Sequence, residues 1–249
     1  MKYIYTLGIV FTLFGCNNEN AWDCIQASGE IIQQDYHVDE FKKIIIWNRV
    51  QLIISQGEEQ SVVVETGENL LNEILVRVED SILKVSNINS CNYVRDYGIT
   101  KVYVTAPDIY EIRNSSGLTV ESIGTIGFEE LTLFSEDRFV EDEFHIDGDF
   151  RLNLDVKTLT IDANGISKFY LNGKARVGHF GLFDGDVRVE AAGLEIEILH
   201  FFHRSTNKMI VYPTHSISGK IVSSGDVIAK NHPPIVEVEE LFTGRLIFE

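Results

Sequence analysis

Acidic residues recur at short intervals through the second half of the chain, several of them beside a glycine. They are Asp147, Asp149, Asp155, Asp162, Asp184, Asp186 and Glu190. If strands stack there, such carboxylates can form a ladder that holds calcium and a uronate sugar, which is the chemistry of a β-helical pectate lyase. A lyase also needs a lysine or arginine base, and the candidates are Lys168, Lys174, Arg176 and Arg188. Solvated turns are the simpler interpretation, so we expect no catalytic residue and keep a polysaccharide-cleaving enzyme as the alternative.

Two histidines, His200 and His203, lie three residues apart. On a helix they would share a face, but on a strand they point to opposite sides, which makes joint metal ligation unfavourable. The sequence contains no nucleophile elbow, phosphate loop, zinc spacing or calcium-loop motif. We therefore expect no enzyme, no metal and no cofactor.

Aromatic residues gather in the same region: Tyr170, Phe180, Phe183, Phe201, Phe202 and Tyr212. Core packing explains most of the phenylalanines, while outward tyrosines can stack on sugar rings. The residues that we select as a candidate ligand surface are Asp162, Asp184, Asp186, Tyr170 and Tyr212.

The elements that would position these side chains are strands. Leu159 and Ile161 alternate with Thr160 and Asp162, and the run Leu194–Ile198 alternates in the same way. Such alternation gives each strand one apolar and one polar face. Glycines end the runs at a steady interval, since Gly165 and Gly185 are 20 residues apart, as are Gly173 and Gly193. A strand unit that recurs about every 20 residues is typical of a stacked solenoid.

The first half of the chain is also predicted to form strands. One hairpin is predicted around Glu79-Asp80-Ser81, between the runs Val76–Val78 and Ile82–Val85. A single helical turn is expected within 67–74. At the ends of the fold, Leu241–Phe248 and the segment around Cys24 are candidates for covers over exposed strand edges.

The N-terminal sequence predicts where the protein is located in the cell. Residues 1–15 have an early lysine and a short apolar stretch, as secretory signal peptides do. Leu13-Phe14-Gly15-Cys16 resembles the lipobox of bacterial lipoproteins, so Cys16 is predicted to carry the lipid that anchors the chain to a membrane. Residues 16–37 are read as the lipid tether and N-terminal segment. Asn17 favours outer-membrane attachment, facing either the periplasm or the cell exterior.

Two further cysteines, Cys24 and Cys91, remain for a disulfide, which is common in exported chains. Two buried free thiols are the alternative. The net charge is −17, which argues against a nucleic-acid partner and is compatible with a hydrated surface, divalent cations or basic partners.

The order of several short motifs resembles the DUF2807 family of auto-transporter adhesins with a head GIN domain. These motifs are Asn69-Leu70-Leu71, Val78–Leu83, Val102–Pro107, Ile112–Gly117, His203–Asn207, Ile217–Ile221 and Ser223–Ile228. The family's Gly-Ser-Gly turns survive here as Ser115-Ser116-Gly117 and Ser223-Ser224-Gly225, with Asn164-Gly165, Asn172-Gly173 and Asp184-Gly185 expected at the middle turns.

The resemblance implies an all-β, right-handed β-helix-like solenoid of short strands over 38–249, with a lobe boundary near 125 if there are two lobes. It also implies an exported, often lipid-anchored protein. We therefore expect a lipid-anchored cell-envelope protein that presents a solenoid surface for binding or adhesion, with a glycan or protein as ligand. The alternatives are the polysaccharide-cleaving enzyme and a structural scaffold without a soluble ligand.

Overall fold

The computed structural model describes residues 26–89, 98–140 and 143–249. The predicted signal peptide, the predicted lipidation site Cys16 and the predicted Cys24–Cys91 disulfide lie outside these residues. Within them the fold is all-β, and seventeen strands join one continuous sheet. No helix of the described residues is long and apolar enough to cross a bilayer.

The strands before residue 125 are short. They are β1 (Ile31–Tyr36), β2 (Lys43–Trp47), β3 (Gln51–Gln56), β4 (Ser61–Gly67), β5 (Ile74–Glu79), β6 (Ile82–Asn87), β7 (Lys101–Ala106), β8 (Glu111–Ser115) and β9 (Val120–Ile123), with the 3₁₀ helix η3 (Glu68–Glu73) after β4. The helical turn expected within 67–74 is this 3₁₀ helix.

Pairing among these strands is mixed. β2 lies parallel to β6 and β8, and β3 lies parallel to β7 and β9, whereas β1–β4, β4–β7 and β5–β6 are antiparallel. The β5–β6 pair confirms the predicted hairpin. Its turn residues Asp80 and Ser81 both have positive φ, 53° and 60°, as a two-residue hairpin turn requires.

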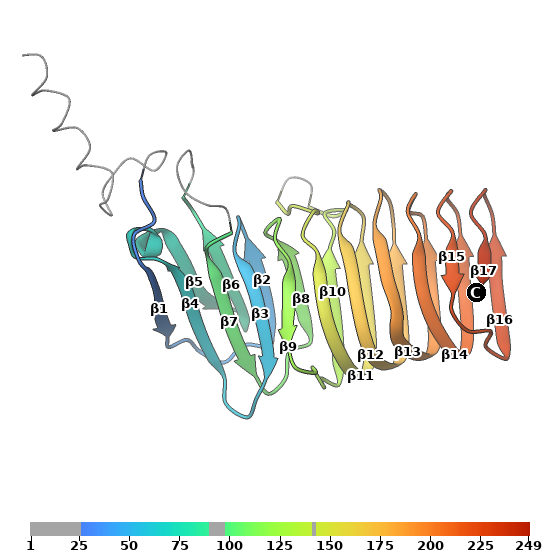
Figure 1. Ribbon diagram of the computed structural model, residues 1–249, viewed down its shortest axis with the longest axis horizontal. Helices are drawn as coiled ribbons and strands as arrows, with labels where there is room; N and C mark the ends of the chain where they lie inside the picture. The colour runs from blue at the N-terminus through green and yellow to red at the C-terminus, as the bar shows by residue number, and fades with distance from the viewer. Residues whose placement is uncertain (1–25, 90–97, 141–142) are drawn as a thin grey trace, which may run out of the picture.

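The remaining strands lie side by side along the long axis of the molecule (Figure 1). They are β10 (Glu130–Ser135), β11 (Phe150–Ala163), β12 (Lys168–Leu182), β13 (Arg188–His203), β14 (Met209–Ile221), β15 (Val227–Ala229), β16 (Ile235–Glu240) and β17 (Leu246–Phe248). Each of β11, β12 and β13 pairs in parallel with the next, and β14 continues in parallel to both β15 and β16.

The strands β11 to β14 are 13 to 16 residues long, which is longer than the short strands that the sequence analysis expected. Each is interrupted where the inward–outward alternation slips by one residue. Lys157-Thr158, Arg176-Val177 and Glu197-Ile198 are consecutive residues of which neither is buried. In a straight strand, a slip of one residue would turn the apolar side chains that follow it to the opposite face. The apolar side chains on both sides of the slip are buried, so the strand has to bend there for both sets to face the core.

The core consists of inward side chains in register from strand to strand. One column runs Ile112, Leu133, Ile161, Phe180, Phe201, and every member is at most 7% exposed. Leu159, Ile161, Leu194 and Ile196, which the alternation predicts to face inward, are all 0% exposed. Burial of such side chains is the main favourable term in the folding free energy.

The glycines have two different roles. Gly165 and Gly185 lie in the connections between long strands, as predicted. The turn predicted at Asn172-Gly173 is wrong, because both residues lie inside β12, beside a register shift between Tyr170 and Asn172. Gly173 has φ 104°, and a Cβ there would sit 2.0 Å from the carbonyl oxygen of Leu154. Only glycine fits this close approach of two neighbouring strands.

The C-terminal segment Leu241–Phe248 does not cover the sheet edge. It contains β17, which pairs with β15 as one more parallel strand. The segment therefore extends the sheet and leaves a new edge.

Candidate functional site

A surface groove with a volume of about 600 Å³ crosses β11, β12 and β13 where their inward–outward alternation slips. Its floor contains the nearly buried Phe128, Val156 and Ala175. Seven charged side chains line it: Glu129, Asp155, Lys157, Lys174, Arg176, Glu195 and Glu197, with Thr214 of β14 at the far side. We call this surface the charged groove.

Strand register sets the order of charges in the charged groove. Asp155 pairs with Lys174, which pairs with Glu195, so one row reads acid, base, acid across three strands. Lys174 Nζ lies 4.0 Å from Glu195 Oε2, and Arg176 Nε lies 3.9 Å from Glu197 Oε2. A third pair joins Lys157 to Glu129. The Lys174 and Arg176 side chains are 69% and 71% exposed, so these loose pairs leave both cations accessible to a ligand.

The sequence builds this groove through the slipped alternation. Lys174 and Arg176 are outward residues of β12, and the second outward residue in a row, Val177, follows at the bend. The same arrangement recurs at Lys157 in β11 and Glu197 in β13. The signal in the sequence is therefore a charged residue followed by a second residue that is not buried, once in each of β11, β12 and β13. It is a different pattern from that of acidic residues beside glycines.

The acidic ladder considered for a lyase does not form. Asp155 is followed across the sheet by Lys174, and Asp162 is followed by Gly181. Glu190 is bound to Arg188 in an ion pair, and Asp149 accepts the backbone N–H of Lys168 at 2.8 Å. A calcium ladder needs several carboxylates in one row, and the register puts a lysine or a glycine at the next position instead.

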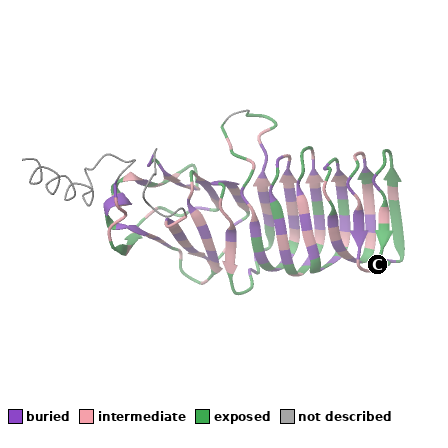
Figure 2. Ribbon diagram, turned by 45° about the horizontal axis from the view of Figure 1, so that its top comes forward, coloured by how far each residue is buried: buried purple, intermediate pink, exposed green. Residues whose placement is uncertain are grey.

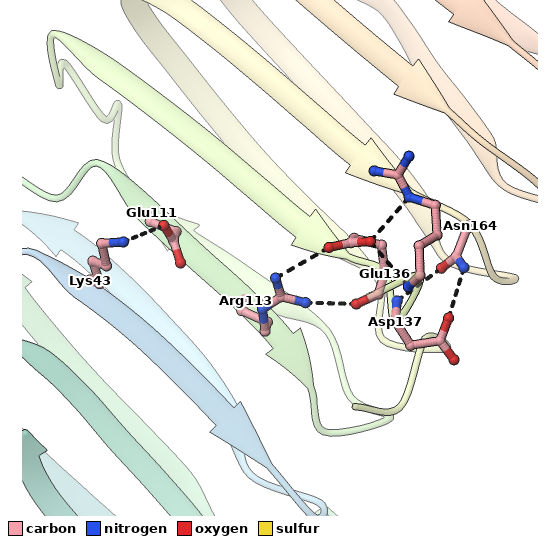
Figure 3. A network of polar contacts seen from close by, with 7 residues as sticks. Lys43, Glu111, Arg113, Glu136, Asp137 and Asn164 are labelled. Atoms are coloured by element: carbon pink, nitrogen blue, oxygen red, sulfur yellow. Dashed lines mark hydrogen bonds and ion pairs between the residues drawn. The ribbon is translucent and has the colours of Figure 1, made fainter. Parts of the chain in front are cut away.

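Asp162 belongs to a second polar cluster, made with Arg113, Glu136 and Arg138. Arg113 donates to the Glu136 backbone oxygen at 2.6 Å and lies 3.4 Å from its carboxylate, and Arg138 Nε lies 3.1 Å from the same carboxylate (Figure 3). Burial raises the pKa of the Asp162 carboxyl; the positive charge of Arg138 opposes this rise, and the charge of Glu136 adds to it.

Aromatic rings surround this second cluster. The Arg113 guanidinium lies over the rings of Phe134 and Phe144, 4.6 and 4.4 Å from their centroids. Arg138 lies 3.3 Å from the centroid of Phe183, which in turn stacks on Phe202 at 5.8 Å. The N–H edges of both guanidinium groups thus contact Glu136, and their flat faces contact aromatic rings. We assign this cluster to the support of the fold, because little of the Glu136 side chain, 7%, remains exposed.

The other predicted ligand residues do not come together. Asp184 lies in an exposed turn, 3.9 Å from Arg204, and Asp186 accepts hydrogen bonds from Thr206 and Asn207 at 2.8 and 3.1 Å. Tyr170 lies beneath the Arg151 guanidinium, 4.5 Å away, and pairs with Glu190. Tyr212 pairs with Glu195 and so lies next to the charged groove. Of the five predicted residues, Tyr212 is the one beside this groove.

The histidines separate as strand geometry requires. His203 is fully buried and His200 is exposed, so the two point to opposite sides of β13. His200 instead stacks on His179 of β12, with ring centroids 5.3 Å apart, and its Nδ1 lies 2.7 Å from the Ser218 hydroxyl. Within residues 26–89, 98–140 and 143–249 no group of three or more histidine, cysteine, aspartate or glutamate side chains is placed to hold a metal ion.

Several solved structures share this fold. A "putative adhesin" from Bacteroides fragilis superposes with a TM-score of 0.77 at 19% identity, covering 90% of this chain and 99% of that one. A "putative adhesin" from Parabacteroides distasonis gives a TM-score of 0.64 at 13% identity, covering 90% and 99%. A "putative lipid binding protein" from Parabacteroides distasonis gives 0.59 at 12% identity, covering 88% and 97%.

A search of curated proteins finds no match. The family model described as "Putative auto-transporter adhesin, head GIN domain" matches residues 40–233, which is most of the chain. The motifs that indicated this resemblance in the sequence all lie within that range. The chain therefore belongs to the DUF2807 family of head GIN domain proteins.

Proposed function

We propose that this protein is a lipid-anchored adhesin of the cell envelope, which binds an extended, charged polymer in the charged groove. The observation that carries the proposal is the row Asp155, Lys174, Glu195, which repeats a charge at each strand across the groove. Neighbouring strands are about 4.8 Å apart, so an extended chain crossing them meets a new side chain at every step. Many weak contacts of this kind add to a firm attachment.

The mixed signs of the groove indicate the class of ligand. Lys174 of β12 is flanked by Asp155 on β11 and Glu195 on β13, whereas Arg176 and Lys157 pair with Glu197 and Glu129. A uniformly anionic polysaccharide or nucleic acid would be attracted by the three cations of the groove and repelled by its four carboxylates. A polypeptide with basic and acidic side chains can complement both signs of charge. We therefore favour a protein ligand and keep an anionic glycan as the second arm of the test.

The architecture suits this role if the parallel strands form a right-handed β-helix-like solenoid. Supporting this, Phe150 pairs with Phe169 and Lys168 pairs with Arg188, which corresponds to about 20 residues per coil. A solenoid holds its outward side chains in fixed rows without help from a ligand. Binding then orders few groups, which limits the entropy lost on association.

The proposed location at the cell envelope is based on the N-terminal sequence and on the family description. The lipobox-like Leu13–Cys16 and the auto-transporter adhesin family both favour an exported protein at the cell envelope, attached to the outer membrane through Cys16. Fractionation of cells tests this directly. Cys16→Ser should move the protein from the membrane fraction to the soluble exported fraction, and retention in the membrane would show that lipidation is not the anchor.

Binding is tested with the purified Cys16→Ser chain on an array of envelope-protein peptides and on uronate-containing and neutral polysaccharides. Lys174→Glu should reduce retention of the selected ligand by about tenfold, because it reverses the central charge of the groove. Lys208→Glu is the matched control, since Lys208 is exposed and lies outside the groove. Equal losses for both variants would contradict the proposal.

The same experiment also tests whether the protein is a polysaccharide lyase. Cleavage of a uronate polysaccharide with calcium would raise the ultraviolet absorbance from unsaturated chain ends. Such a rise, abolished by Lys174→Glu and not by Lys208→Glu, would replace adhesion by catalysis as the function of the groove. Retention without any rise supports adhesion.

A further inference from the structure

The last two strands, β16 and β17, form an open edge of the sheet. β16 pairs with β14 and β17 pairs with β15. No strand of the described residues lies on the other side of either, and both stand at the end of the molecule near the label C (Figure 1). Half of the backbone N–H and C=O groups of such a strand point away from the sheet and can pair with another chain.

At this edge the last apolar side chains of the core columns are exposed, because no further strand covers them. Val236 continues the position of Ile217, and it is 39% exposed where Ile217 is 0%. Phe248, which continues the position of Ala229, is 37% exposed. Leu241 and Phe242 between the two strands are 58% and 61% exposed. In Figure 2 the last strand is largely green, whereas the strands before it carry purple bands of buried residues.

Two outward side chains of β16, Glu237 and Glu239, are acidic, and Glu239 pairs with Lys220 of β14 at 3.2 Å. Glu240 continues the inward position of Ile221 and pairs with Arg245 at 3.5 Å. Glu237 lies opposite Ser218, and no ion pair joins it to another described residue. The edge thus combines the apolar inward positions Val236 and Val238 with two outward carboxylates, Glu237 and Glu239.

Two-fold pairing with a second copy of the chain brings like charges together in the registers that pair Val238 with a valine. Two β16 strands related by a two-fold axis run antiparallel, and residues opposite each other share a face. The registers that place Val238 of one copy opposite Val236 or Val238 of the other put Glu237 opposite Glu237, or Glu237 opposite Glu239. Like charges directly opposite each other are destabilising, so the sequence disfavours end-to-end dimers in these registers.

We propose that the β16–β17 edge binds a partner protein by accepting one of its strands, in which apolar residues alternate with lysine or arginine. The partner's apolar residues would cover Val236 and Val238, and its basic residues would lie beside Glu237 and Glu239. Main-chain hydrogen bonds supply affinity, and the alternate side chains supply specificity. This surface is separate from the charged groove, so the inference does not depend on the proposed function.

The test uses the full chain and a fluorescent peptide of alternating lysine and valine. Binding is followed by fluorescence anisotropy, and the site is mapped by amide hydrogen exchange. Two further probes are an alternating glutamate–valine peptide and a lysine–valine peptide whose alternate amides are N-methylated, which keeps the charge and removes the edge hydrogen bonds. Glu237→Lys is the test variant. Glu59→Lys is its control, because Glu59 is an exposed residue outside the β16–β17 edge.

The expected result is binding of the lysine–valine peptide with added exchange protection in 235–240. Both N-methylation of the probe and Glu237→Lys should weaken it by about tenfold or more, and Glu59→Lys should not. Equal binding of the N-methylated probe would mean that general attraction to a chain of net charge −17 suffices, and would overturn the proposal. Concentration-dependent self-association that protects the same amides would also overturn it, in favour of a second copy.

Discussion

The rings of Phe150 and Phe169 stack almost in parallel, with centroids 4.9 Å apart and planes 6° from each other, inside adjacent strands β11 and β12. The two residues are direct partners in the parallel register, and both are 0% exposed. Equivalent residues of neighbouring strands thus fill one column of the core. A gap in this column removes contacts with the strands on both sides.

We predict that Phe169→Ala lowers the free energy of unfolding by about 3 to 5 kcal/mol, because it leaves a cavity in a close-packed column. Tyr170→Ala is the control, since this neighbour points outward and its main contact is with Arg151. Its loss should be smaller. Urea denaturation measures both, and equal losses would show that the column does not dominate the stability of β12.

A glycine inside a strand should matter more than a glycine in an open turn with a similar backbone. Gly173→Ala adds a methyl group 2.0 Å from the Leu154 carbonyl oxygen, whereas Gly124 has φ 73° and nothing within 4 Å of the added atom. Gly124→Ala should cost about 1 kcal/mol for the left-handed backbone, and Gly173→Ala about 3 kcal/mol or more. Thermal and urea unfolding compare the two. A Gly173→Ala protein as stable as Gly124→Ala would contradict the close approach of β11 and β12.

Acid should destabilise the protein through His203. Burial lowers the pKa of this imidazole from 6.5 to about 4, although the backbone at Asn207 and Gly225 opposes the change. Between these two pH values the unfolded chain binds the proton and the folded chain does not. Stability therefore falls as the pH drops from about 6.5 to about 4, by on the order of 3 kcal/mol in total, and changes no further below that through this group.

His203→Leu should flatten this part of the pH dependence. His179→Asn should remove a smaller share, since the pKa of His179 is also lowered, by burial and by the charge of His200. Denaturant unfolding at a series of pH values measures the slopes. An unchanged slope in His203→Leu would mean that other groups cause the acid sensitivity.

The charge of Glu136 should measurably change the pKa of the Asp162 carboxyl. Glu136 raises the pKa of the Asp162 carboxyl and Arg138 lowers it. Glu136→Gln should therefore lower the pKa of Asp162, and Arg138→Ala should raise it. Carbon-13 NMR titration of the carboxyl group measures both shifts, and shifts of the same sign in the two variants would contradict the arrangement of this cluster. Glu136→Gln should also cost about 1 to 3 kcal/mol of stability, because two guanidinium groups lose a mostly buried partner.

Alternation in the sequence was enough to predict the strands, the hairpin at Asp80-Ser81 and the burial of Leu159, Ile161, Leu194 and Ile196. It did not place Gly173 inside a strand, because a glycine required by the close approach of another strand looks the same in sequence as a glycine required by a turn. The charged groove was missed for a related reason. Whether Asp155 faces Lys174 or another acid depends on the number of residues between paired positions, and a single bulge changes that register.

The most direct test of an adhesive groove is attachment under load. Beads coated with the chain are brought to a surface carrying the ligand selected on the arrays, and the force needed to detach them is measured. The account predicts that reversing Lys174 and Arg176 to glutamate abolishes most of the attachment, while Lys208→Glu preserves it. Full attachment of the doubly reversed protein would contradict the assignment of the charged groove as the binding site.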